Sequence, residues 1–315
     1  MRLVFIAAFT ICCLSATSDD QQFNGRWDIT VNGDHPRAWW LEVSGAGTAS
    51  VKGRFVGAPG GQVDDIPKLS LSDGELRFAF ERRYNREQKN PQKGMYYARL
   101  DDGKLKGTFE IEGEPSTYLE WMGVRAPAIP DKDDGAWKKG EAISLFDGRD
   151  LSGWAPQNPA RPAGWSVKDG MMINSAGSSN LVSEKKFWNF ILHAEFRIGV
   201  RSNSGIGLRG RYELQLADDF DRPPSIRGTG AIFDRIPPTM NAGDLPGEWQ
   251  SLDVRLVGRQ VTVVLNAVKV IDKQTIDGLT AIATNANEGD PGPIVIQGDR
   301  GPIEIRRIVI YPLTR

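Results

Sequence analysis

The chain has 315 residues, of which 40% are hydrophobic and 25% are charged, and its acidic and basic residues nearly balance at a net charge of −1. Because both signs are interspersed, the sequence has no basic stripe of the kind that binds nucleic acid. Beyond residue 18, no stretch approaches the roughly twenty apolar residues that a membrane-spanning helix needs. We therefore expect no nucleic acid among the partners and no membrane span.

The first eighteen residues are predicted to be a secretory signal peptide. Arg2 precedes an apolar run over residues 3–14, and small residues follow up to Ser18. We expect cleavage after Ser18 and a mature protein that is secreted or periplasmic. The two cysteines, Cys12 and Cys13, lie within the signal. The mature chain would therefore have neither a disulfide nor a thiol nucleophile.

A small all-β domain is expected over residues 19–125. Apolar residues alternate there in short runs, as they do in strands with one buried face, and these runs fall at 27–31, 39–43, 51–56, 69–71, 76–80, 95–100, 105–111 and 118–122. Asp73-Gly74 and Asp102-Gly103 stand between neighbouring runs, where Asp-Gly favours a hairpin turn. The pattern indicates a small antiparallel β-barrel or sandwich, whose role the sequence does not give.

Trp39 and Trp40 are adjacent in one of these runs. An exposed tryptophan could cover the apolar face of a sugar ring. However, adjacent strand residues point to opposite faces, so at most one of the two faces the core at that point. We predict that Trp40 packs under a loop rather than forming an exposed platform.

Residues 126–142 are expected to link two domains, because residues 126–135 have no periodicity and contain two prolines. Strands resume in the segment 143–315. They are predicted at 165–168, 171–174, 189–199, 205–209, 211–217, 230–236, 249–257, 260–265, 269–272, 292–297 and 302–312. This number of strands in about 170 residues fits a two-sheet jelly-roll sandwich. The predicted fold class is thus all-β throughout.

The strand predicted at 211–217 carries the most informative side chains. Alternation places Tyr212, Leu214 and Leu216 on one face and Glu213 and Gln215 on the other. A carboxylate and an amide with Asn203 and Arg209 nearby in sequence could hold a polyhydroxylated ligand or move a proton. The alternative is an ordinary solvated sheet face.

A set of ordered motifs in the second half resembles the 3-keto-disaccharide hydrolase domain family, whose fold is similar to that of concanavalin A-like lectins and glucanases. The resemblance covers residues 144–313. It is carried by the segments at 145–154, 165–170, 190–197, 203–206 with Arg209, 212–215, 230–233, 247–250, 265–266 and 292–297. It implies a concanavalin A-like jelly roll for this domain.

The resemblance implies an enzyme that acts on 3-keto-glycosides or 3-keto-disaccharides. The ketone acidifies the hydrogen on C2, so one base can remove it and the oxygen on C1 can leave by elimination. Glu213 is the candidate base and Gln215 the second candidate catalytic residue. Candidate substrate-binding residues are Asn203, Ser204, Arg209, Asp218, Trp249, Gln297 and Asp299. For Glu213, the alternative is a purely structural ion pair with Arg209 or Arg211.

The chain departs from the family pattern at several positions. Arg300 stands where the family commonly has histidine, Arg307 where it has asparagine, and Ala267 where it has glycine. These departures leave two rival functions open, a noncatalytic lectin-like carbohydrate-binding protein and a structural adhesion protein. If the base is not Glu213, Glu195 and Asp299 are the next candidates.

The expected partner is a carbohydrate or an oxidised glycoside, with no cofactor. Asp218, Asp219 and Asp221 form an acidic loop whose oxygens could bind a divalent cation such as calcium, but isolated acidic loops are more often solvated. The metal is therefore left unassigned.

Overall fold

The computed structural model describes residues 19–33, 37–57, 62–84, 88–175 and 177–315. The predicted signal peptide lies outside the described residues. The described chain is almost entirely β, as predicted, with one short 3-10 helix, η1 (Asp20–Phe23), before the first strand. Among these residues, no helix combines the length and the apolar character that crossing a lipid bilayer requires.

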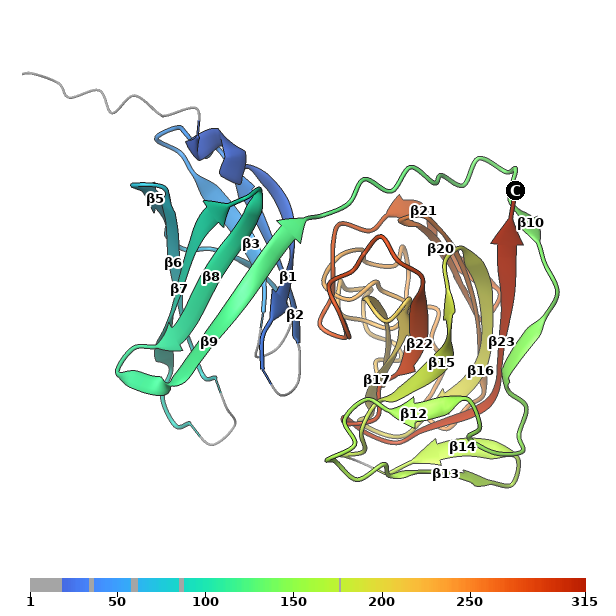
Figure 1. Ribbon diagram of the computed structural model, residues 1–315. Helices are drawn as coiled ribbons and strands as arrows, with labels where there is room; N and C mark the ends of the chain where they lie inside the picture. Colours follow the sequence, from blue (N-terminus) through green and yellow to red (C-terminus); the bar gives the residue numbers. More distant parts are fainter. Residues whose placement is uncertain (1–18, 34–36, 58–61, 85–87, 176) are drawn as a thin grey trace, which may run out of the picture.

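Residues 25–125 form one antiparallel sheet that curls around its own core (Figure 1). Its strands lie in the order β4-β3-β2-β1-β9-β8-β7-β6-β5. Their bounds are β1 (Gly25–Val31), β2 (Arg37–Ser44), β3 (Lys52–Val56), β4 (Val63–Asp65), β5 (Leu69–Ser72), β6 (Glu75–Arg82), β7 (Gln92–Asp101), β8 (Lys104–Ile111) and β9 (Glu114–Arg125). Each predicted apolar run coincides with one of these strands, although the run at 51–56 starts one residue before β3.

The two Asp-Gly pairs turn the chain as predicted. Asp73 and Gly74 have φ angles of 53° and 68° and join β5 to β6, and Asp102 and Gly103 have φ angles of 48° and 70° and join β7 to β8. Positive φ at both central residues is the conformation that matches a tight turn to the twist of its strands. Glycine adopts that conformation without strain, which explains its place at the second position.

Residues 138–315 form a sandwich of two antiparallel sheets (Figure 1). The larger sheet has the order β13-β14-β23-β16-β19-β20-β21, with β10 and β11 also paired to β23. Its strands are β10 (Lys138–Lys139), β11 (Ile143–Phe146), β13 (Trp165–Lys168), β14 (Met171–Asn174), β16 (Phe190–Ile198), β19 (Gln250–Val257), β20 (Gln260–Leu265), β21 (Val268–Thr275) and β23 (Ile303–Thr314). The sandwich confirms the predicted jelly-roll architecture.

The smaller sheet has the order β12-β15-β22-β17-β18. Its strands are β12 (Trp154–Pro156), β15 (Leu181–Phe187), β17 (Asn203–Leu208), β18 (Tyr212–Ala217) and β22 (Gly292–Ile296). One face of this sheet packs on the larger sheet, and a single hydrophobic core fills the space between them. Leu192 and Phe196 of β16 meet Ile206 and Leu214 of β17 and β18 in that core. The other face of the smaller sheet is therefore available for a site.

One predicted strand is wrong. Residues 230–236 form turns with isolated bridges instead of a continuous strand. Gly230 and Asp234 have φ angles of 84° and 58°, which bend the backbone out of the extended conformation. The segment still serves the sheet, because the amide of Gln215 donates to the carbonyl of Ala231 at 2.9 Å. It thus covers the free edge of β18.

The segment between the two β-structures runs along the sandwich from the end of β9 to β10 (Figure 1). Asp131 accepts hydrogen bonds from the Trp188 indole and the Asn189 amide at 2.8 Å each, and Asp133 pairs with Arg255 at 2.8 Å. Although it has no strand before residue 138, the segment is therefore tied to the second half by side-chain hydrogen bonds.

Candidate functional site

Glu213 and Gln215 lie on the face of the smaller sheet that points away from the sandwich core. In the register of β17 and β18, Gly207 is opposite Glu213 and Gly205 is opposite Gln215. Glu213 and Gln215 are nearly inaccessible, with 3% and 1% of their surface exposed. The alternation within β18 is thus as predicted, but the face is covered, so the alternative of a solvated sheet face is wrong.

The two glycines make room for the Glu213 carboxylate. A Cβ atom at Gly205 would lie 2.9 Å from Oε1 of Glu213, and one at Gly207 would lie 2.9 Å from Cβ of Val295. Real Cβ atoms do not approach other atoms so closely, so larger residues would displace their neighbours. The glycines therefore leave a shallow trough along β17 beside the carboxylate.

Loop 276–291, which joins β21 to β22, covers this trough. The Glu213 amide donates to Oγ1 of Thr280 at 2.8 Å, and the Thr284 amide donates to the carbonyl of Gly210 at 2.8 Å. The side chain of Ile282 lies 3.3 Å from the position of a Cβ at Gly207. These contacts place the loop directly over the β17–β18 hairpin.

Burial changes the acid–base chemistry of Glu213. It raises the pKa of the carboxyl from 4.5 to about 7; the positive charge of Arg300 acts in the opposite direction and the negative charge of Asp299 raises it further. Among the described residues, no hydrogen bond or ion pair reaches this carboxylate, so neither Arg209 nor Arg211 forms the structural ion pair considered above. A lone carboxyl that titrates near neutrality suits a general acid or base.

Two amide side chains near Glu213 have unsatisfied oxygens. Within the described part of the chain, Oε1 of Gln215 and Oε1 of Gln297 are buried without a hydrogen-bond partner. Gln297 is brought beside β17 by its backbone amide, which donates to the carbonyl of Gly205 at 2.9 Å. Buried polar atoms normally have partners, so these two oxygens have unused capacity to accept hydrogen bonds.

Asn203 and Asp299 belong to the same neighbourhood. Asn203 pairs with Ala217 in the β17–β18 register and so shares the face of Gln215, and its amide donates to the carbonyl of Arg300 at 3.3 Å. Asp299 precedes Arg300, and its charge acts on Glu213. Five predicted site residues are therefore brought together: Asn203, Glu213, Gln215, Gln297 and Asp299.

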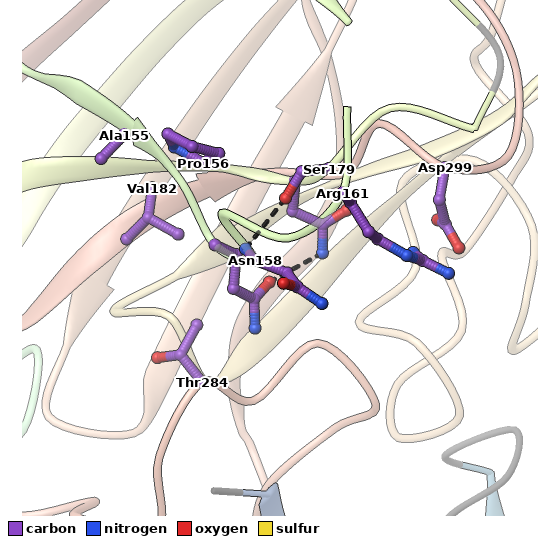
Figure 2. Close-up of a pocket in the computed structure, with 10 residues that line it drawn as sticks. Ala155, Pro156, Asn158, Arg161, Ser179, Val182, Thr284 and Asp299 are labelled. Atoms are coloured by element: carbon purple, nitrogen blue, oxygen red, sulfur yellow. Dashed lines mark hydrogen bonds between the residues drawn. The ribbon is translucent and has the colours of Figure 1, made fainter. Parts of the chain in front are cut away.

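A pocket of about 620 Å³ opens on this side of the smaller sheet (Figure 2). Ala155, Pro156 and Val182 lie at one end, and Arg161 and Asp299 lie at the other. The remaining lining residues are polar, namely Gln157, Asn158, Ser179, Asn180 and Thr284. Their hydrogen bonds to one another, such as Asn158 N–H to Ser179 Oγ at 3.0 Å, hold the rim in place.

The strand register connects this pocket with Glu213. One row runs across the sheet from Ala155 through Val182, Val295 and Gly207 to Glu213. Residues in one row share a face. The lining residues Ala155 and Val182 and the buried carboxyl of Glu213 therefore lie on the same face of the smaller sheet.

Four predicted substrate-binding residues lie elsewhere. Ser204 faces the core side and donates to the carbonyl of Gln297 at 2.8 Å, and Asp218 accepts the Arg201 amide at 2.6 Å. Trp249 is absent from the pocket lining, and the centre of its ring lies 4.9 and 4.5 Å from the guanidinium carbons of Arg197 and Arg306. These three residues therefore have structural contacts and do not line the pocket.

Arg209 was also predicted to bind substrate, but it does not line the pocket. It sits in the turn after β17 with a φ angle of 52°, and its fully buried guanidinium stacks over Trp188 at 4.3 Å and Tyr212 at 5.3 Å. One of its nitrogens donates to the carbonyl of Gly258. Its charge thus lies at the end of the hairpin, away from the trough.

Glu195, the reserve candidate for the base, is also remote from the pocket. Its carboxylate pairs with Arg306 and lies 3.4 Å from Nε2 of His193 on β16. Those three residues lie on the face of the larger sheet opposite the core, since Ala194 and Phe196 fill the core. Glu195 therefore has no access to a ligand on the smaller sheet.

The sequence prediction missed Asn158, Arg161, Asn180 and Thr284, which line the pocket from irregular segments. Loop residues have no periodicity, so no pattern marks them. Arg300 was noted only as a departure from the family, whereas its charge reaches Glu213. Among the residues that the structure describes, no three acidic or histidine side chains gather closely enough to hold a metal ion.

Comparison with known proteins adds a family to this geometry. The sequence profile of the 3-keto-alpha-glucoside-1,2-lyase-like domain matches residues 141–311, more than half of the chain. A Bacteroides thetaiotaomicron protein named 3-keto-disaccharide hydrolase is 24% identical over 148 residues, covering 36% of this chain and 51% of that protein. The chain thus spans about half the length of this relative.

Two solved structures from Parabacteroides distasonis, both assigned provisionally as glycosyl hydrolases, are also similar. One is 28% identical with a TM-score of 0.46 and covers 59% of this chain and 93% of its own. The other is 21% identical with a TM-score of 0.45 and covers 56% and 100%.

Proposed function

Because the chain belongs to the 3-keto-alpha-glucoside-1,2-lyase-like domain family, we propose that it is an exported enzyme that cleaves 3-keto-glycosides or 3-keto-disaccharides. Glu213 is the base that removes the proton on C2. The observation that carries this assignment is a buried carboxyl that has no hydrogen-bond or ion-pair partner among the described residues, whose pKa is raised to about 7, and which shares a row of the sheet with lining residues of the pocket.

The chemistry requires one base and a way to hold negative charge. Glu213 takes the proton from C2, and the electrons of that C–H bond form an enolate with the C3 ketone. The bond between C1 and the glycosidic oxygen then breaks, a double bond forms between C1 and C2, and the leaving oxygen takes up a proton. Addition of water at C1 completes a net hydrolysis.

The surrounding side chains suit this sequence of events. The positive charge of Arg300 acts at the position of Glu213, where it would favour the enolate oxygen over the neutral ketone. The unsatisfied oxygens of Gln215 and Gln297 would accept hydroxyl protons of the sugar. The pocket over Ala155 and Val182 would hold the leaving group. Under this proposal, substrate recognition and proton transfer occur on one face of the smaller sheet.

The test is turnover of a 3-keto-disaccharide by the purified mature protein, with the same disaccharide lacking the ketone as the substrate control. We expect a monosaccharide to be released from the 3-keto-disaccharide and not from the control disaccharide. Glu213→Gln should reduce turnover by about 10²–10⁴, the contribution of general-base catalysis. Glu81→Gln, at an exposed glutamate of β6 in the amino-terminal sheet, is the matched control and should retain it. Saturable sugar binding without any turnover by the parent would support the lectin-like alternative instead.

A further inference from the structure

The two β-structures meet at loop 276–291, the same loop that covers Glu213. Trp40 lies on β2, on the side opposite Trp39, which fills the core of the amino-terminal sheet. Trp40 is fully buried in a separate cluster with Val56 of β3 and with Leu279 and Ala286 of the loop. Trp40 therefore packs under a loop, as predicted from the sequence.

The fit between Trp40 and the loop is close. A Cβ atom at Gly278 would lie 2.3 Å from Nε1 of Trp40, so only glycine allows the loop backbone to approach the indole at this position. Arg235 stacks over the same ring at 4.4 Å and donates to the carbonyl of Leu279 at 2.6 Å. The indole thus contacts the loop, and it also packs against Arg235, whose guanidinium donates a hydrogen bond to the loop.

A charged contact at the edge of the cluster adds to the attachment. Asp277, the second residue of the loop, accepts a hydrogen bond from Arg54 of β3 at 2.9 Å and pairs with Arg26 of β1. The amide of Val63 on β4 donates to Asp234 at 2.6 Å, next to Arg235. Strands β1 to β4 of the amino-terminal sheet therefore all take part in the contact with the second half.

We propose that the amino-terminal sheet positions loop 276–291 over the catalytic face, with Trp40 as the positioning residue. The loop has no regular secondary structure of its own. At one end it holds Trp40 through Gly278 and Leu279. A few residues later it binds β18 through Thr280 and the turn before β18 through Thr284. Exclusion of water from Glu213 thus depends on contacts made by the other domain.

This inference rests on the proposed function for its kinetic readout, but its structural readout does not. Trp40→Ala should free the loop, and hydrogen–deuterium exchange across residues 276–291 should rise by about a hundredfold, the effect of deleting a large buried side chain. Water would then reach Glu213 and the acidic limb of the pH profile of kcat/KM should move from about 7 towards 4.5. Trp40→Phe should show both effects to a smaller extent than Trp40→Ala.

Two further variants complete the test. Leu105→Ala removes a buried side chain from the amino-terminal core without touching the loop, and it should change neither the loop exchange nor the pH limb. Asp277→Ala, at a side chain that is 40% exposed, should also raise hydrogen–deuterium exchange across residues 276–291. This variant tests the attachment of the loop if Trp40→Ala does not fold.

Equal protection of residues 276–291 in Trp40→Ala, Asp277→Ala and Leu105→Ala would overturn the positioning role. Absence of turnover by the parent would refute the proposed function alone, because the exchange measurement still tests the contact between Trp40 and the loop.

Discussion

Replacing Glu213 by glutamine should have opposite effects on activity and on stability at neutral to alkaline pH. Burial raises the pKa of this carboxyl from 4.5 to about 7 in the folded protein. Between these values the folded state binds the proton more tightly than the unfolded state. The stability gained from the protonated form is therefore complete below pH 4.5 and is lost as the pH rises through 7.

The size of the effect follows from the two pKa values. At about 1.36 kcal/mol for each pH unit, a rise from 4.5 to about 7 corresponds to about 3 kcal/mol. Glutamine has nearly the same shape and does not ionise. The free energy of unfolding of Glu213→Gln, measured relative to the parent, should therefore increase by about 3 kcal/mol between pH 4 and pH 8.

Denaturant unfolding at both pH values gives this double difference, because titrations common to both proteins cancel. Glu81→Gln, with its exposed side chain, should show no such increase. A difference between Glu213→Gln and the parent that does not change with pH would mean that Glu213 has an ordinary pKa. In the parent, kcat/KM should rise through pH 7 as the base ionises, whereas the residual activity of Glu213→Gln should lose that limb.

Four other predictions follow from the site and the chain organisation. Gln215→Ala and Asn203→Ala should each weaken substrate binding and turnover together by about two- to tenfold, as expected for a lost neutral hydrogen bond, and an unchanged KM would contradict this. Mass spectrometry of the exported protein should place its first residue near Asp19; an intact Met1 would disprove processing. Limited proteolysis should cut first near residues 129–135, between the two cores, and earlier cuts inside either core would refute the boundary. Burial and the charge of Glu288 raise the pKa of Asp28 to about 8. The unfolding free energy of Asp28→Asn, measured relative to the parent, should therefore be higher at pH 9 than at pH 5. The same difference at both pH values would argue against a buried acid.

The sequence was sufficient to predict most of the strands because burial imposes a period of two. β16 shows this clearly, since Phe190, Leu192 and Phe196 fill the core while His193 and Glu195 face outward. The same rule placed Glu213 and Gln215 together on β18. It failed at 230–236, where apolar residues lie in turns that cover a sheet edge.

The site could be predicted only in part, because closeness in sequence does not determine direction in space. Arg209 is four residues from Glu213, but its turn conformation sends the guanidinium towards Trp188. Trp249 belongs to a family motif, yet it stacks on Arg197 away from the pocket. Asn158 and Thr284 line the pocket from loops, and no local pattern identifies such residues.

The role of Trp40 shows why the two halves have to be considered together. Keeping an ionised Glu213 dry costs about 3 kcal/mol above pH 7, as estimated above. Burying a tryptophan removes about 150–250 Å² from water, which at about 25 cal/mol per Å² stabilises by at most about 4–6 kcal/mol. The burial of Trp40, to which loop 276–291 contributes Leu279 and Ala286, is therefore of the same order as the cost of the buried base. Under the proposed positioning role, the amino-terminal sheet thus contributes to the basicity of Glu213 through the loop that Trp40 holds.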